Sequence, residues 1–223
     1  MNIRIDRLIR SKRKTIGLQI TPEAALVVRA PKSANIKAIE NVIAKHEDWI
    51  RTKQEFIRSH PRILRSKKFT DGEEFLFLGH PYKLNILEND HIPLAFAGAF
   101  HISRKHLSEA KRLFINWYIS RAKDIIPERV CLQAQRIGYK LNSIHISKAK
   151  TRWGSCSSRG KLNFSWRLVM SPIESIDYVV IHELAHLKHR DHSKIFWGEV
   201  ERMMPDYKNH RLWLKKNESL MVL

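Results

Sequence analysis

Two histidines and a glutamate stand close together in the segment His182-Glu183-Leu184-Ala185-His186. On a helix, histidines four residues apart lie one turn apart on the same face, so their imidazoles can bind one divalent ion. Glu183 is rotated away by one residue, and its carboxylate can reach a metal-bound water without binding the ion. The pattern predicts hydrolysis, in which a metal activates a water molecule and Glu183 accepts its proton.

A catalytic zinc ion has three protein ligands and one open position, so a third ligand is expected near the motif. His192 follows His182 by ten residues, which is the histidine spacing of the metzincin peptidases. We favour His192, because Asp191-His192-Ser193 indicates a chain reversal that brings its imidazole back towards the pair. His189, which stands where the metzincin pattern has glycine, is the alternative ligand. If neither binds, residues 189–192 form an exposed basic patch without a metal.

A peptidase site needs two further parts. An extended substrate is held by pairing with the edge of a strand, and the alternating residues 162–166 are a candidate for that strand. The oxyanion that develops in the reaction needs a positive group or a hydrogen-bond donor. Arg152, His189 and Tyr207 are candidates for this role, and the sequence leaves the choice among them open. Cys156 is not expected to be a nucleophile, because no base stands beside it in a recognisable arrangement.

The fold that positions these residues is predicted to be α+β, with two regions, 1–103 and 104–223. The first region reads as strand–helix–strand. Its expected elements are a hairpin of 15–20 with 26–30, one helix from about 33 to 60, a second hairpin of 75–78 with 82–86, and two short strands at 94–96 and 99–102.

The second region is predicted to begin with a long helix from about Leu107 to Gly138, which Pro127 kinks or breaks in two. Strands are expected at 144–146 and 162–166. A helix from 172 to 189 then carries the histidine motif, since proline and glutamate suit its first turn. A final helix is expected over 194–204, ending before a proline.

The composition narrows the class of protein. The chain has 223 residues, of which 43% are hydrophobic and 28% charged, as in a folded soluble domain. Its 41 Lys and Arg against 22 Asp and Glu give a net charge of +19, which attracts anions such as nucleic acid, nucleotides or acidic membrane surfaces. The longest stretch without charged residues, His91–Ser103, is about 13 residues and too short to span a membrane. With no visible secretory signal and only two cysteines, the sequence predicts a cytoplasmic protein.

Longer segments around the motif carry a resemblance to a known family. They are Arg152–Cys156, Leu162-Asn163, Pro172, Asp177–His186, His192-Ser193, Phe196-Trp197 and Met204–Tyr207. These segments resemble the YgjP-like metallopeptidase family, which is similar to the SprT-like and WLM metalloprotease domains, and weaker landmarks of that family fall in the first 82 residues. The resemblance implies a zincin-like metallohydrolase core, with His182, His186 and His192 as metal ligands and Glu183 as catalytic base.

The predicted function is therefore a zinc-dependent hydrolase, and a metallopeptidase acting on peptides or proteins is favoured. Nickel, cobalt and manganese also bind imidazole sites and remain alternatives to zinc.

Two other functions stay open. Some members of the resembled family are described as nucleoside triphosphate pyrophosphatases, with UTP as the nucleotide, and the positive charge suits a triphosphate. Against this, the chain has no glycine-rich phosphate loop and no carboxylate cluster for magnesium beside the histidines. The other alternative is a basic nucleic-acid-binding module with a structural zinc. Structural zinc sites have four protein ligands, which the three-histidine set does not supply.

Overall fold

The computed structural model describes residues 3–21, 23–59, 67–88 and 91–223 and divides the chain into two compact units, Met1–Ser66 and Lys67–Leu223. The sequence predicts a boundary at residue 103, and the structure places it at residue 66. The reason is that Phe75, Leu84, Phe100 and Ile102 are buried in the same apolar core as the C-terminal helices. The strands before residue 103 therefore belong with the part of the chain that carries the histidine motif.

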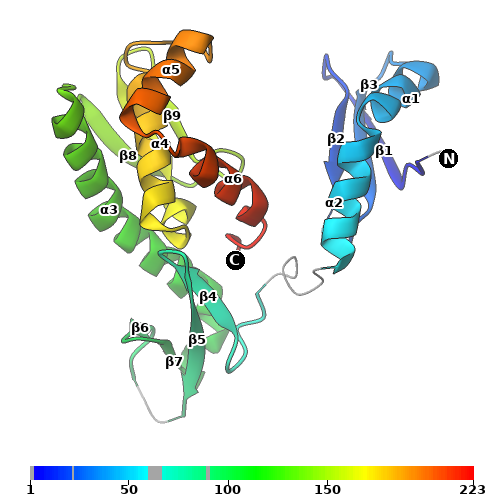
Figure 1. Ribbon diagram of the computed structural model, residues 1–223. Helices are drawn as coiled ribbons and strands as arrows, with labels where there is room; N and C mark the ends of the chain where they lie inside the picture. Colours follow the sequence, from blue (N-terminus) through cyan, green and yellow to red (C-terminus); the bar gives the residue numbers. More distant parts are fainter. Residues whose placement is uncertain (1–2, 22, 60–66, 89–90) are drawn as a thin grey trace. The chain divides into compact units, whose positions relative to one another are not determined.

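The N-terminal unit is a three-stranded sheet in the order β1-β3-β2, packed against two helices (Figure 1). Strand β3 pairs in parallel with β1 and antiparallel with β2, and the second pairing confirms the predicted hairpin. The predicted single helix is wrong: it ends at His46 and a second helix begins at Glu47, where Glu47 and Asp48 favour a helix start. The elements are β1 (Arg7–Ser11), β2 (Gly17–Ile20), β3 (Leu26–Pro31), α1 (Ile36–Lys45) and α2 (Glu47–Ser59).

The C-terminal unit begins with a four-stranded sheet in the order β4-β5-β7-β6. The predicted hairpin between β4 and β5 is confirmed. Its turn needs Gly79, which has a φ of +82° and whose added Cβ would lie 2.7 Å from Pro172. This turn therefore packs directly against the start of the helix that carries the motif. The strands are β4 (Glu74–Phe77), β5 (His80–Leu87), β6 (Ala95–Phe96) and β7 (Phe100–Ser103).

A long helix, α3 (Ala110–Ile137), follows a short 3-10 helix, η1 (Arg104–Glu109). The helix continues through Pro127, so the expected break in two does not occur. Ala122, Ile126 and Val130, which flank the proline, are fully buried in the core. We infer that this packing outweighs the cost of an internal proline, which is about 3 kcal/mol. The helix ends at Gly138 in the left-handed conformation, as expected.

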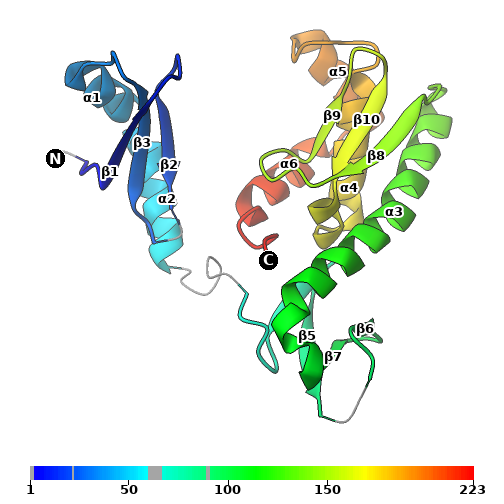
Figure 2. The ribbon, with the colours of Figure 1, turned by 180° about the vertical axis from the view of Figure 1, so that it is seen from behind.

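A second sheet lies beside α3, with the strand order β8-β10-β9. Figure 2 shows its three strands between α3 and the helices that follow. Strand β10 is central, because it pairs in parallel with β8 and antiparallel with β9. The prediction that the strand at 162–166 binds the substrate is therefore wrong, because both of its edges are already paired. Strand β9 lies at an edge of the sheet instead. The strands are β8 (Ser143–Ser147), β9 (Gly154–Cys156) and β10 (Lys161–Ser165).

The remaining chain forms a short 3-10 helix and three α-helices, which complete the large core. The motif helix is shorter than expected, because it ends at Ala185 and His186 is its C-cap. Helix α6 has no counterpart among the predicted elements. The elements are η2 (Trp166–Met170), α4 (Ile173–Ala185), α5 (Lys194–Met203) and α6 (Tyr207–Asn217).

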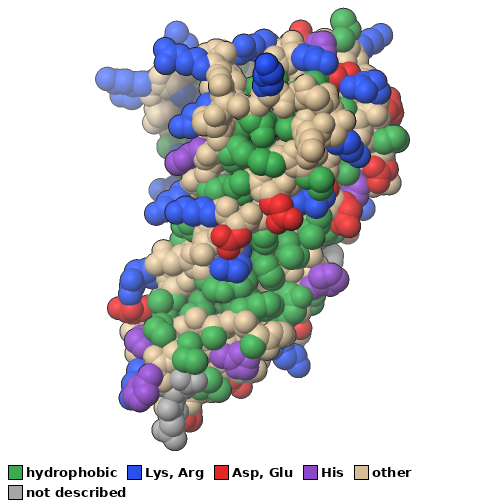
Figure 3. Space-filling model, turned by 90° about the vertical axis from the view of Figure 1, so that its left-hand side faces the viewer, with side chains coloured by type: hydrophobic (Ala, Val, Ile, Leu, Met, Phe, Trp, Pro, Cys, Tyr) green, Lys and Arg blue, Asp and Glu red, His purple; other side chains and the backbone are tan. Residues whose placement is uncertain are grey.

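The surface of the molecule carries the positive charge that the composition indicates. On the face shown in Figure 3, Lys and Arg side chains are spread over the surface with apolar side chains between them. Among the described residues, none of the helices has both the length and the apolar character needed to cross a membrane.

Candidate metal centre

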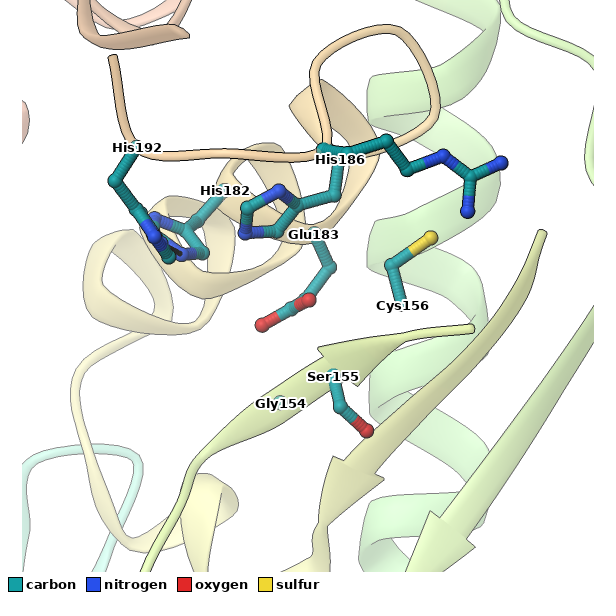
Figure 4. Close-up of a pocket in the computed structure, with 8 residues that line it drawn as sticks. Gly154, Ser155, Cys156, His182, Glu183, His186 and His192 are labelled. Atoms are coloured by element: carbon teal, nitrogen blue, oxygen red, sulfur yellow. Dashed lines mark hydrogen bonds between the residues drawn. The ribbon is translucent and has the colours of Figure 1, made fainter. Parts of the chain in front are cut away.

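Three histidines from one helix end and the loop after it converge on one point. His182 lies in the last turn of α4, His186 caps that helix, and His192 immediately precedes Ser193, the N-cap of α5. Each offers a ring nitrogen, and these nitrogens all lie within 4.8 Å of one another. The Nε2 atoms of His182 and His192 are 3.1 Å apart. Figure 4 shows the three rings pointing towards one another.

The loop between α4 and α5 is held by its own hydrogen bonds. Asp191 Oδ1 accepts the backbone N–H of Ser193 at 3.2 Å, and Ser193 Oγ accepts the N–H of Phe196 at 3.4 Å. The Nδ1 of His186 is 2.9 Å from the backbone oxygen of His189. If Nδ1 donates to this carbonyl, the Nε2 of His186 is left free to bind a metal. His189 thus contributes its backbone carbonyl, and its ring is outside the three-histidine cluster.

Aromatic rings surround the cluster. The ring of His186 stacks on Phe196 with 4.5 Å between centroids, and Trp197 lies 5.6 Å from His182 and 5.8 Å from His192. Burial is the main reason that the pKa of His182 falls to about 3, and the neighbouring His186, His192 and Arg211 lower it further. The pKa of His192 is also lowered, again mainly by burial. The lowered pKa values favour the neutral form of His182 and His192, which is the form that binds metals.

Glu183 is buried beside the histidines and faces strand β9 (Figure 4). A Cβ added at Gly154 would lie 2.6 Å from Glu183 Oε1, so only glycine leaves room for the carboxylate there. Burial raises the pKa of Glu183 to about 8, and the charge of Arg152 and a backbone hydrogen bond from Cys156 partly oppose this. No described residue donates a hydrogen bond to its buried Oε2 atom. A carboxylate in this position lacks the positive partner that a bound cation supplies.

The cluster opens on two adjoining cavities. One, of about 300 Å³, is lined by all three histidines, Glu183, the residues of β9 and Arg190. The other, of about 200 Å³, is lined by Trp153, Gly154, Tyr178, Val179, His182 and Glu183. Three imidazoles, an adjacent carboxylate and open space on one side fit a divalent metal that keeps a position for substrate.

The candidates for oxyanion stabilisation lie in different places. Arg152 is exposed next to β9, and its charge acts on Glu183. The ring of His189 lines neither cavity, and neither does Tyr207. Tyr207 is buried in a stack between Tyr178, 6.2 Å away, and Trp197, 5.4 Å away. Of the three candidates, only Arg152 is shown to act electrostatically on Glu183.

Three residues beside the site are absent from the sequence-based candidates. Tyr178 lines the smaller cavity. It stands four residues before His182, and this spacing on a helix predicts that the two side chains share one face. Arg190 lines the larger cavity. Arg211 lies over Trp197 at 4.7 Å and belongs to α6, a helix that the sequence does not predict.

Cys156 lies at the larger cavity but has no feature of a nucleophile. Burial is the main cause that raises the pKa of its thiol, and the charge of Glu183 adds to it. The thiol therefore stays protonated at neutral pH, in agreement with the sequence-based expectation.

Comparisons with known proteins place the chain in a family. The model of the YgjP-like, metallopeptidase domain family matches residues 14–217. Among solved structures, the metallopeptidase zymogen abylysin of Pyrococcus abyssi is 26% identical, with 41% of this chain and 93% of that chain covered and a TM-score of 0.37. The zymogen jannalysin of Methanocaldococcus jannaschii is 22% identical, with 42% and 93% covered and a TM-score of 0.33. No curated protein matches the chain. Because the family model covers most of its length, this chain belongs to the YgjP-like metallopeptidase domain family.

Proposed function

We propose that the protein is a metal-dependent peptidase whose ion is held by His182, His186 and His192. The observation that carries this proposal is the convergence of three imidazoles, whose ring nitrogens lie within 4.8 Å of one another, beside Glu183, whose buried Oε2 has no hydrogen-bond partner among the described residues. When bound, the ion supplies Lewis-acid polarisation of the scissile carbonyl and of the attacking water. Zinc is the ion we propose.

Glu183 is the proton carrier in this proposal. The charge of a bound cation would lower the raised pKa of Glu183, and the resulting carboxylate accepts the proton of the attacking water and passes it to the leaving amine. The contact with Gly154 and the hydrogen bond from Cys156 hold the carboxylate on the side of α4 that faces the cavities. Arg152 stabilises negative charge beside it, and we therefore prefer it among the three oxyanion candidates.

Strand β9 is the surface that binds the substrate backbone in this proposal. It pairs with β10 along one side, and no other described strand pairs with it. Its residues line the larger cavity together with Glu183 and the histidines. An extended peptide that pairs with this edge would pass directly in front of the histidines. A helix with two histidines, a third histidine after it and an edge strand beside it make up a zincin-like core.

The substitution Glu183→Gln tests the function. It removes the proton acceptor and keeps the three imidazoles, so the metal content should be unchanged while hydrolysis of an unfolded protein falls roughly 10²- to 10⁴-fold. Elemental analysis identifies the ion, and mass spectrometry follows the peptides that are released. Retained hydrolysis by metal-loaded Glu183→Gln protein would contradict the role of Glu183. If the wild type, loaded with the metal it is purified with, hydrolyses nucleoside triphosphates and cleaves no protein, the peptidase proposal is wrong.

A further inference from the structure

Most arginines of the C-terminal unit are neutralised or used structurally. Arg136 and Arg167 donate to backbone carbonyls. The ion pairs are Arg104–Glu88, Arg112–Glu109, Arg121–Asp124, Arg129–Asp177 and Arg202–Glu199. Arg152, Arg190 and Arg211 also form no ion pair with another described residue, and each of them lines the larger cavity or acts electrostatically on Glu183 or the histidines. Arg159 likewise forms no ion pair with a described residue and is adjacent to Ser158, whose carbonyl accepts from Arg190 at 2.9 Å.

The three unpaired arginines approach the histidine cluster from three separate elements. Arg190, in the loop after α4, lines the larger cavity. Arg152 precedes β9, and its charge lowers the pKa of Glu183. Arg211, on α6, lies 4.7 Å from the centre of the Trp197 ring, which itself contacts the His182 and His192 rings. Its charge lowers the pKa of both histidines.

The cavities contain almost no negative charge to balance these groups. Glu183 is the one acidic residue among the described residues that line them. Asp191, in the same loop as Arg190, keeps a negative charge that raises the pKa of His192, but it lines neither cavity. Glu199, on α5, is paired with Arg202. The space beside the histidine cluster, where a scissile bond would lie, is therefore positively charged. The planar guanidinium groups of the three arginines can donate paired hydrogen bonds to a carboxylate.

We infer that the site selects peptides with Asp or Glu side chains next to the scissile bond, and that Arg152, Arg190 and Arg211 make this selection. The inference rests on the proposed peptidase function and adds the substrate class. Each arginine is exposed, so each is expected to contribute about two- to fivefold in kcat/KM, the range of exposed charge pairs. Together they favour an acidic peptide over its amide counterpart by about tenfold or more.

The experiment begins with the metal-loaded wild-type protein and a mixture of peptides from a digested proteome. Mass spectrometry of the cleaved peptides gives the residues on both sides of each cleaved bond. Two matched peptides are then made from one cleaved sequence, one with Glu and one with Gln beside the scissile bond. The kcat/KM ratio between the two peptides measures the preference independently of overall activity.

Three variants and two controls locate the preference. Arg152→Gln, Arg190→Gln and Arg211→Gln should each reduce the Glu-to-Gln ratio about two- to fivefold. Arg112→Gln and Arg121→Gln remove exposed arginines of α3 that pair with neighbouring acids, and should leave the ratio unchanged. The wild-type ratio should also fall when the salt concentration rises from 0.05 to 0.5 M, because the screening length drops from above about 10 Å to a few ångströms.

Three results would overturn the inference. Equal kcat/KM values for the two peptides, or a ratio unchanged in all three arginine variants, would refute it and leave the peptidase function intact. Cleavage sites enriched in Lys and Arg would do the same. If no peptide is cleaved at all, or if only nucleoside triphosphates are hydrolysed, the proposed function fails and this inference fails with it.

Discussion

His189 and His192 are three positions apart, yet only the ring of His192 joins those of His182 and His186. The difference arises from the loop conformation. Helix α4 ends at Ala185, so His189 is not on a continued helix and offers its carbonyl to His186 instead. The two histidines therefore have separate roles in the structure, one through its side chain and one through its backbone.

This separation gives a prediction about metal content. His192→Ala should lower the metal affinity more than a hundredfold, because a ligand is lost, whereas loss of an outer hydrogen-bond partner costs 10- to 100-fold. His189→Ala keeps the carbonyl, so its metal content should equal that of the wild type. Elemental analysis of both purified variants checks the prediction. Loss of metal from His189→Ala alone would show that His192 is not the third ligand.

At the scale of residues, the sequence predicts the part of the site that depends on regular spacing. Helical periodicity is enough to bring His182 and His186 to one face. It is also enough to place Tyr178 one turn earlier on the same face. The contact between His186 and the His189 carbonyl depends on the path of a loop, which no periodicity describes. The sequence leaves the choice among Arg152, His189 and Tyr207 open for the same reason, since that choice needs positions in space.

At the scale of elements, the close packing of β9 against α4 places the carboxylate of Glu183. Gly154 permits this approach, because an added Cβ would lie 2.6 Å from Oε1 and 2.7 Å from Cγ of Glu183. Contacts under 3.0 Å require a shift of the strand or of the side chain. Such a shift would affect catalysis, because misplacing a catalytic group by 1 Å can lower the rate about 100-fold.

Gly154→Ala should therefore lower kcat roughly 10- to 100-fold and leave the three histidines, and so the metal content, in place. Gly198→Ala is the matched control. Gly198 lies in α5 with nothing within 4 Å of an added Cβ, so alanine there should keep full activity and stabilise the protein by about 0.5–1 kcal/mol. Peptide hydrolysis, elemental analysis and thermal unfolding separate these effects. Wild-type turnover in Gly154→Ala would show that the carboxylate position does not depend on the strand.

The elements themselves were predicted well where local patterns decide them. The hairpins β2–β3 and β4–β5, the long helix α3 and its exit at Gly138 all follow from alternation, periodicity and glycine chemistry. The prediction that residues 162–166 pair with the substrate is wrong, because alternation of apolar and polar residues indicates a strand but does not show whether the strand is central or at an edge. That distinction depends on β9, which is three residues long and too short to give a pattern.

At the scale of the whole molecule, the two units have separate cores. Leu26, Val28 and Ile39 are buried in the N-terminal core, and every residue of the larger core lies between Phe69 and Leu223. The sequence could not place this boundary, because strands β4–β7 resemble those of the N-terminal unit in pattern. Only the burial of Phe75 and Phe100 against α3 shows the core to which they belong.

This division predicts that residues 67–223 fold without the N-terminal unit. All three histidines, Glu183 and the lining of both cavities lie in this fragment. The purified fragment should therefore bind one metal ion per chain and unfold cooperatively on heating, as monitored by circular dichroism. The fragment with His192→Ala serves as the control for specific binding. A fragment that is unfolded, or that binds no metal although the full chain does, would show that the units depend on each other.

The hydrogen bond between His186 and the backbone of His189 has a consequence for how related sequences can diverge. A main-chain oxygen is present whatever amino acid stands at position 189, so this contact places no demand on residue type there. It does fix the number of peptide units between His186 and position 189. Evolutionary variation between these positions should therefore appear as exchange of one amino acid for another, while insertions and deletions should be selected against.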